Sequence, residues 1–111
     1  MTPGDIVWVP FPHVEDNSLQ SRPALIVASR LAGSLDLCWA LMITAETNPA
    51  WPEDVVVHDS TATGLPIPSR IRTGKIATLA AASATPIGRL PEGAWHEVRE
   101  RLATTLKIAA S

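Results

Sequence analysis

The segments GDIVWVPFP at residues 4–12 and SRPALIVAS at residues 21–29 decide the fold class of this chain. Both are rich in apolar and β-branched residues, and the residues between them are polar or turn-forming. They therefore predict strands at about 5–11 and 23–29, joined by a long loop. Arg22 stands directly before Pro23, whose ring forces an extended backbone on the preceding residue. A guanidinium held at the start of a strand is well placed to bind a phosphate.

Short strands also account for most of the remaining chain. Residues 36–44, 54–58, 69–76 and 85–89 predict four more, with a short helical turn at 60–64 and an ambiguous segment at 77–84. After Pro91 the period changes, and apolar residues recur at helical spacing at positions 95, 98, 102 and 106. The pattern predicts one mainly β domain over residues 1–111, a strongly bent antiparallel sheet or small barrel with a C-terminal amphipathic helix.

Composition limits the classes of function. The 111 residues suffice for one domain, and 46% hydrophobic residues suffice for a core. A net charge of −2 argues against a general nucleic-acid binder, although it leaves room for a local basic patch. No signal peptide or membrane-length apolar run is visible, so we expect a cytoplasmic protein without a membrane partner. The lone Cys38 is expected to be a buried, unreactive thiol.

Few residues are candidates for chemistry. The histidines, at positions 13, 58 and 96, have no metal-ligand spacing, and neither a phosphate-binding glycine loop nor a nucleophile elbow is present. The cations Arg70, Arg72 and Lys75 are expected to alternate onto one face of a strand, where they could follow an RNA backbone. The same stripe could equally be a solvated face or a docking site for an acidic protein segment.

The four tryptophans, at positions 8, 39, 51 and 95, allow two interpretations. Large aromatic side chains are mostly buried, so core packing is the simpler one for each. Those that remain exposed could supply an oligomer interface.

The segments resemble, in order, those of the PemK/MazF family, the toxin half of bacterial toxin–antitoxin pairs. The first two strands carry its GD-W-V-F and RPA signatures. Further along, ALMIT at 40–44, GLPIPSRIRTGKIATL at 64–79 and IGRL at 87–90 are similar to three later family segments. The resemblance covers most of the chain. It implies an SH3-like barrel that pairs into a homodimer and is neutralised by a cognate antitoxin.

The resemblance also implies an activity. Family members cut single-stranded RNA without a metal or cofactor, as the ribose 2′-hydroxyl attacks its own phosphate to leave a cyclic phosphate and a free 5′-hydroxyl. Arg22 matches the catalytic arginine and would stabilise charge on phosphorus, and Thr44 would hydrogen-bond the phosphate. His13 could act as general acid or base. The RNA-binding candidates are Gln20, Ser21, Arg70, Arg72 and Lys75.

Two positions depart from the family pattern. Many relatives have an acidic residue where this chain has Gly74, and many have a cation where it has Gln20. Glu15, Asp16 or His13 could substitute from the first loop. These departures keep a second hypothesis open: a non-catalytic SH3-like barrel that binds an antitoxin or a DNA gyrase-type target. A third is a dimeric adaptor with no toxicity.

Overall fold

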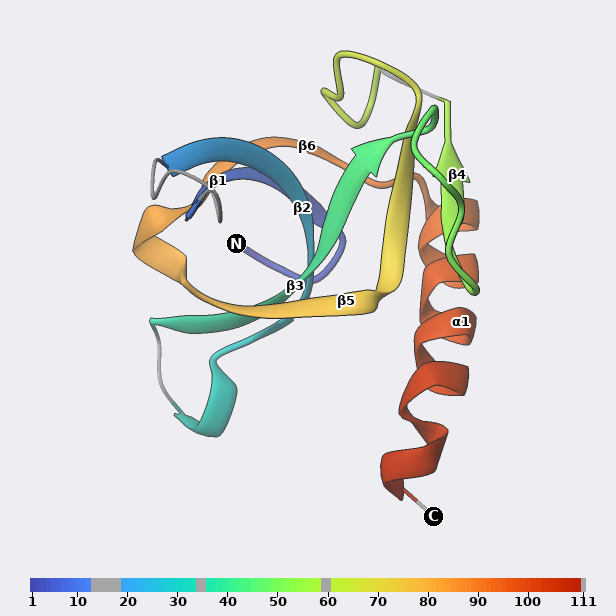
Figure 1. The fold of residues 1–111 in the computed structure, drawn as a ribbon. Helices are drawn as coiled ribbons and strands as arrows, with labels where there is room; N and C mark the ends of the chain where they lie inside the picture. The colour runs from blue at the N-terminus through green and yellow to red at the C-terminus, as the bar shows by residue number, and fades with distance from the viewer. Residues whose placement is uncertain (13–18, 34–35, 59–60, 111) are drawn as a thin grey trace.

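One curled antiparallel sheet and one long helix make up the fold (Figure 1). The computed structural model describes residues 1–12, 19–33, 36–58 and 61–110. The six strands follow the order β4-β5-β3-β2-β1-β6. Their bounds are β1 Asp5–Pro12, β2 Leu19–Ser29, β3 Leu37–Ala45, β4 Val55–Val57, β5 Ser69–Ala80 and β6 Thr85–Arg89; α1 spans Glu92–Ala110, and the 3₁₀ turns η1 and η2 span Leu31–Gly33 and Ala81–Ser83.

All six predicted strands and the helix are confirmed, with three corrections. Strand β2 begins at Leu19, so Arg22 lies within it, opposite Val9, rather than at its mouth. The ambiguous segment continues β5 as far as Ala80, which pairs with Leu37 and gains ladder hydrogen bonds there. Residues 61–63 form a turn and not a helical turn, and residue 60 lies outside the described residues.

Register shifts bend the sheet. Along β3, Leu41 and Met42 are consecutive, but their partners on β5 are Ile76 and Arg72, so β5 bulges between them. Further irregularities lie between Ile26 and Ala28 of β2 and between Pro86 and Gly88 of β6, which face the consecutive residues Ile6 and Val7. Bulges increase local twist and curvature. The sheet accordingly curls around the N-terminus, as Figure 1 shows, into a half-barrel.

Two apolar cores lie on the two faces of this sheet. The larger one joins sheet residues such as Leu41 and Ile71 to Val98 of α1, which stands against β4 and β5 outside the curl (Figure 1). The second includes Ala24 and Ala40, whose side chains leave the sheet on the opposite face. Helix α1 begins one residue after Pro91, whose carbonyl accepts a hydrogen bond from Trp95 N at 2.9 Å.

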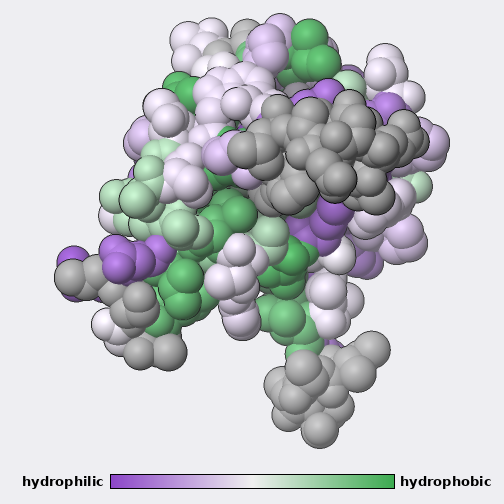
Figure 2. All heavy atoms as spheres, turned by 60° about the vertical axis from the view of Figure 1, so that its left-hand side comes forward, coloured by the Kyte–Doolittle hydropathy of each residue, from purple (hydrophilic) through white to green (hydrophobic). Residues whose placement is uncertain are grey.

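Some large apolar side chains stay at the surface. Trp8 and Trp95 are partly buried, in line with core packing, but Trp39 and Trp51 are exposed. Leu37, Trp39 and Leu106 are each about two-fifths exposed. Figure 2 shows hydrophobic side chains gathered on the lower part of one face. No helix in the described part of the chain is both long and apolar enough to span a membrane.

Candidate functional site

Arg22, Thr44 and Arg70 form a row across three neighbouring strands. Strand register pairs Thr44 with Arg70, and Ala24 with Met42. Arg22 and Thr44 lie two residues beyond that second pair, each on its own strand. Because alternate residues of a strand point to the same face, all three side chains share one face at one end of the sheet. The two predicted catalytic residues of the described chain are therefore brought together.

The Arg22 guanidinium is exposed and oriented by its neighbour. Its Nη2 donates a hydrogen bond to Gln20 Oε1 at 2.7 Å. Arg22 and Gln20 are two residues apart on β2, so they lie on the same face, whereas Ser21 points to the other face. Gln20 thus belongs to this site and Ser21 does not join it. Asp54, a carboxylate that could otherwise form a surface salt bridge with Arg22, is paired with Arg72 instead.

The hydroxyl of Thr44 is also held in a defined way. Asn48 Nδ2 donates to Thr44 Oγ1 at 2.5 Å, and Asn48 N donates to Ala45 O at 3.0 Å, which closes a tight turn after β3. A hydroxyl that accepts one hydrogen bond still has its own hydrogen to donate. Thr44 can therefore donate a hydrogen bond to an anion above the sheet.

Arg70 presents the open end of its guanidinium. Its Nε donates to Glu46 O at 3.0 Å, which fixes the partly buried side chain. Within the described ranges, its Nη1 and Nη2 make no hydrogen bond or ion pair. Two guanidinium groups and a hydroxyl donor at one sheet end form an arrangement suited to a phosphate.

Arg72 does not belong to an exposed basic stripe, and that prediction is wrong at this position. Its Nη1 lies 3.0 Å from Asp54 Oδ2, with the two side chains only 8% and 3% exposed. Its Nη2 donates to Pro49 O at 2.9 Å, and its Cζ lies 4.2 Å from the centre of the Trp51 ring. The contacts of the guanidinium hold the segment between β3 and β4 in place. Asp54, directly before β4, was the missed partner.

Lys75 and Gly74 lie in the bulge of β5, where the register with β3 is interrupted. The alternation predicted to align Lys75 with Arg70 and Arg72 is lost there. Lys75 is exposed and makes no ion pair with any described residue. It adds positive charge near this part of β5 without a fixed position in the row.

The sequence did not reveal the pair formed by Glu46 and His58, whose Oε2 and Nε2 atoms are 2.9 Å apart. Glu46 lies two residues beyond Thr44, and His58 two residues beyond Val56, which pairs with Arg70. The pair therefore adjoins the row of Arg22, Thr44 and Arg70. Because only the crossing from β3 to β4 brings the two residues together, no local spacing could have signalled it.

Other predicted sites have different outcomes. His13, Glu15 and Asp16 lie outside the described residues. Among the residues that are described, no group of three or more His, Cys, Asp or Glu side chains could hold a metal ion. Cys38 is buried as predicted, and burial raises the pKa of its thiol, which keeps it protonated and unreactive.

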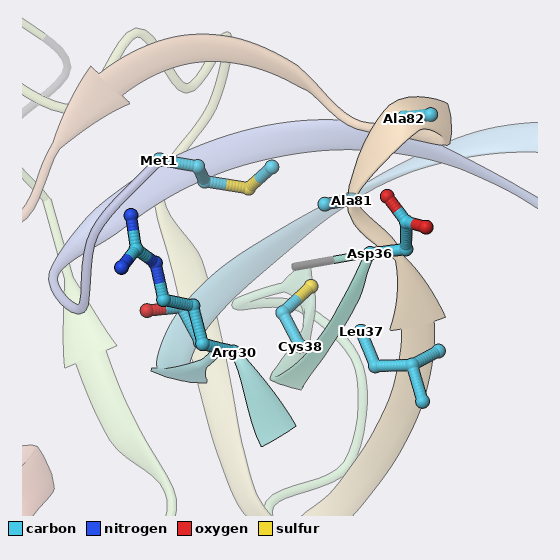
Figure 3. Close-up of a pocket in the computed structure, with 8 residues that line it drawn as sticks. Met1, Arg30, Asp36, Leu37, Cys38, Ala81 and Ala82 are labelled. Carbon is cyan, nitrogen blue, oxygen red and sulfur yellow. The ribbon is translucent and has the colours of Figure 1, made fainter. Parts of the chain in front are cut away.

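A hollow of about 480 Å³ lies at the opposite end of β2 and β3 from the row. Figure 3 shows Met1 and Arg30 on one side of it, Asp36 and Ala81 on the other, and Cys38 between them. Because Arg22 and Thr44 lie at the other ends of the same strands, this hollow is separate from the candidate phosphate site.

Comparison with solved structures supports the fold. MazF from Deinococcus radiodurans is 22% identical, with a TM-score of 0.74 and 96% of each chain covered. Toxin MazF-mt6 from Mycobacterium tuberculosis is 19% identical, with a TM-score of 0.71 and 93% of this chain and 96% of that one covered. A mycobacterial endoribonuclease, solved in complex with its cognate antitoxin, is 18% identical, with a TM-score of 0.73 and coverage of 97% and 96%.

The family model gives the assignment that these distant structures cannot give alone. A search of the curated proteins finds no match. The model described as "PemK-like, MazF-like toxin of type II toxin-antitoxin system" matches residues 2–106, nearly the whole chain. The match includes every strand and the residues of the Arg22, Thr44 and Arg70 row. The chain therefore belongs to the PemK-like, MazF-like family of type II toxin–antitoxin toxins.

Proposed function

We propose that this toxin is an endoribonuclease that cleaves single-stranded RNA at a phosphate bound by Arg22, Thr44 and Arg70. The observation that carries the proposal is their placement in one row at one end of the sheet. The row offers donors from three strands, and strands hold side chains more precisely than loops do. Family membership supports the same activity.

The proposed reaction is transfer of the phosphate to its own ribose. The 2′-oxygen attacks phosphorus, the bond to the 5′-oxygen breaks, and a 2′,3′-cyclic phosphate and a 5′-hydroxyl are formed. Negative charge grows on the non-bridging oxygens as this happens. Arg22 and Arg70 would donate to these oxygens, and Thr44, fixed by Asn48, would add a third hydrogen bond. Donors already in place at developing charge are usually the largest contribution to catalysis.

Two protons must also move. One leaves the 2′-hydroxyl and another reaches the 5′-oxygen. Imidazole and carboxylate groups are the usual carriers. Among the described side chains, Glu46 and His58 are the pair next to the row that has this chemistry, and they are hydrogen-bonded to each other. His13 stays a prediction for the same task, and comparing His58→Ala with His13→Ala in single-turnover cleavage would distinguish them.

The remaining parts of the proposal concern partners. A cognate antitoxin would neutralise the toxin, since the mycobacterial endoribonuclease of this fold is solved with one. We propose a homodimer, supported by the exposed apolar residues Leu37, Trp39 and Leu106. Light scattering should give twice the 11.8 kDa chain mass, and a single-chain mass would contradict the dimer. We expect the toxin to act in the cytoplasm, where the proposed RNA substrate is found.

The direct test is cleavage of RNA by purified protein, with and without EDTA. The wild type should cut single-stranded RNA in both conditions and leave cyclic phosphate ends. Arg22→Ala and Thr44→Ala should each reduce kcat by about 10²–10³, the usual cost of one such donor. Arg99→Ala, on the exposed surface of α1, is the matched control and should cleave normally.

Two outcomes would contradict the proposal. Full cleavage by the Arg22 variant would remove the assigned site. Growth arrest on expression without any RNA cleavage, in the cell or by purified protein, would favour the non-catalytic alternative, in which the barrel binds a gyrase-type protein target. Such a result would be explained by the exposed Gly74, which supplies no carboxylate where many relatives have one.

A further inference from the structure

Trp51 is an exposed indole with the Arg72 guanidinium over one of its faces. The side chain is 44% exposed, more than any other tryptophan in the described chain. The Arg72 guanidinium covers one face of the ring, with Cζ 4.2 Å from its centre. Since Arg72 itself is buried, it lies between the ring and the sheet. The exposed area of Trp51 therefore belongs to its outer face and edges.

The ring is also fixed from below. Trp51 N donates to Asp54 Oδ2 at 2.9 Å, the same oxygen that pairs with Arg72. Arg72 in turn donates to Pro49 O at 2.9 Å. These contacts tie the chain on both sides of Trp51 to one buried ion pair. A ring already held in place loses little conformational freedom when a ligand stacks on it.

Trp51 lies on the face that carries the proposed phosphate site. Arg72 and Arg70 are two residues apart on β5 with no bulge between them, so both side chains leave the sheet on that face, about 7 Å apart along the strand. The chain reaches β4 from β3 by crossing β5, which lies between them in the sheet (Figure 1). Arg72 contacts Trp51 and Pro49 of this crossing, so the crossing passes over that face.

We propose that the outer face of Trp51 stacks on an unpaired nucleobase of the RNA, next to the phosphate held by the row. This inference rests on the proposed endoribonuclease function. Single-stranded RNA is commonly recognised by bases stacked on aromatic side chains. A flat ring over Arg72, two residues along β5 from Arg70, suits a base whose own phosphate lies at the row. Purines, with the larger ring area, should stack best.

Kinetics of three variants test the assignment. Trp51→Ala should raise KM about tenfold for a short RNA with little change in kcat, the loss expected when one aromatic stacking partner is removed. Trp51→Phe keeps an aromatic face and should recover most of the loss. Arg99→Ala is the control, because Arg99 lies on the exposed surface of α1, on the other side of the sheet. It should leave KM unchanged.

An abasic substitution in the RNA identifies the stacked base. At one position flanking the cut, removal of the base should weaken wild-type cleavage about tenfold, yet weaken Trp51→Ala no further, because the contact is already gone. Independent, multiplying losses at every position would overturn the proposal. So would a normal KM in Trp51→Ala, and loss of antitoxin binding with normal cleavage would assign the ring to a protein partner instead.

Tryptophan fluorescence detects the same contact without the Trp51→Ala variant. An RNA with a 2′-deoxyribose at the scissile nucleotide should quench wild-type tryptophan emission and quench Trp51→Phe much less. Equal quenching in both proteins would contradict stacking of a base on Trp51. Failure of the wild type to cleave any RNA would instead count against the proposed function, so the two failures are distinguishable.

Discussion

At the scale of single residues, the most informative contrast is between the two arginines of β5. Arg70 and Arg72 have the same charge, strand and face, and the sequence predicts the same role for both. Their environments separate them. The tip of Arg70 stays open, but Arg72 is enclosed by Asp54, Pro49 and Trp51. One is proposed to bind substrate and the other supports the fold and the Trp51 ring.

The buried pair of Arg72 and Asp54 should make a large contribution to stability when only one member is removed. Arg72→Ala or Asp54→Ala leaves an uncompensated buried charge, and each should lower the free energy of unfolding by about 3–5 kcal/mol. Asp54 Oδ1 has no hydrogen-bond partner within the described structure, so Arg72→Ala would leave this buried carboxylate with Trp51 N as its remaining donor there. Urea denaturation measures both, and the double variant Arg72→Ala with Asp54→Ala should lose much less than the sum of the two single losses. Additive losses would contradict a coupled pair.

Asp5 gives a pH-dependent prediction. Partial burial raises its pKa, but hydrogen bonds from Thr2 N at 2.8 Å and Arg89 Nη1 at 2.7 Å outweigh this, so the pKa lies below its usual value. A carboxyl with a lowered folded-state pKa stabilises the protein above its unfolded pKa, about 3.9, and this contribution is lost as pH falls through the folded value. Asp5→Asn should therefore cost about 0.5–1 kcal/mol at pH 7.

That difference should shrink as pH falls through the lowered folded-state pKa of Asp5, because the wild-type carboxyl is then protonated as well. Urea denaturation of both proteins at pH 7 and at low pH measures it. Arg89→Ala should also reduce the pH dependence of stability, because Arg89 helps to lower the pKa of Asp5. A constant difference between wild type and Asp5→Asn at both pH values would show that Asp5 acts through packing rather than charge.

At the scale of elements, two glycines allow the turn at residues 61–64 to lie against β6. A Cβ on Gly88 would overlap the backbone carbonyl of Thr63, and one on Gly64, whose φ is +71°, would overlap the carbonyl of Ile87. Arg89 N donates to Ala62 O at 2.9 Å and closes the same contact. These two backbones approach too closely for any side chain.

Gly88→Ala should therefore destabilise the protein by about 2–3 kcal/mol, because rigid backbone must move to make room. Gly74→Ala is the matched control, since a Cβ there meets nothing within 4 Å. In thermal melting, Gly88→Ala should have a clearly lower Tm than the wild type, and Gly74→Ala should have nearly the wild-type Tm. Equal melting temperatures for Gly88→Ala and the wild type would refute the close approach.

Elements were predicted well where the signal is local. The β-branched runs and the helical spacing of Trp95, Val98 and Leu102 depend only on neighbouring residues, and they gave the strands and α1. The expectation that Arg22 and Thr44 act at one site came from the family resemblance. Burial of Arg72 and the Glu46 pair with His58 could not be predicted, because each depends on the crossing from β3 over β5 to β4.

At the scale of the whole molecule, an acidic chain has a local basic site. The net charge is −2, yet Arg22 and Arg70 lie in one row with Lys75 farther along β5. Phosphate contacts supply sequence-independent affinity, and aromatic stacking can add a preference among bases. The curled sheet therefore presents the proposed phosphate site and the Trp51 ring on one face, while α1 and the larger core occupy the other.

A crystal structure with a short RNA that carries 2′-deoxyribose at the scissile nucleotide is the most direct test of the proposed phosphate site. That substitution removes the attacking hydroxyl and leaves the phosphate intact. We predict non-bridging oxygens of the scissile phosphate within hydrogen-bond distance of the Arg22 guanidinium, Thr44 Oγ1 and Arg70. RNA bound elsewhere, with its scissile phosphate remote from all three side chains, would contradict the proposed site.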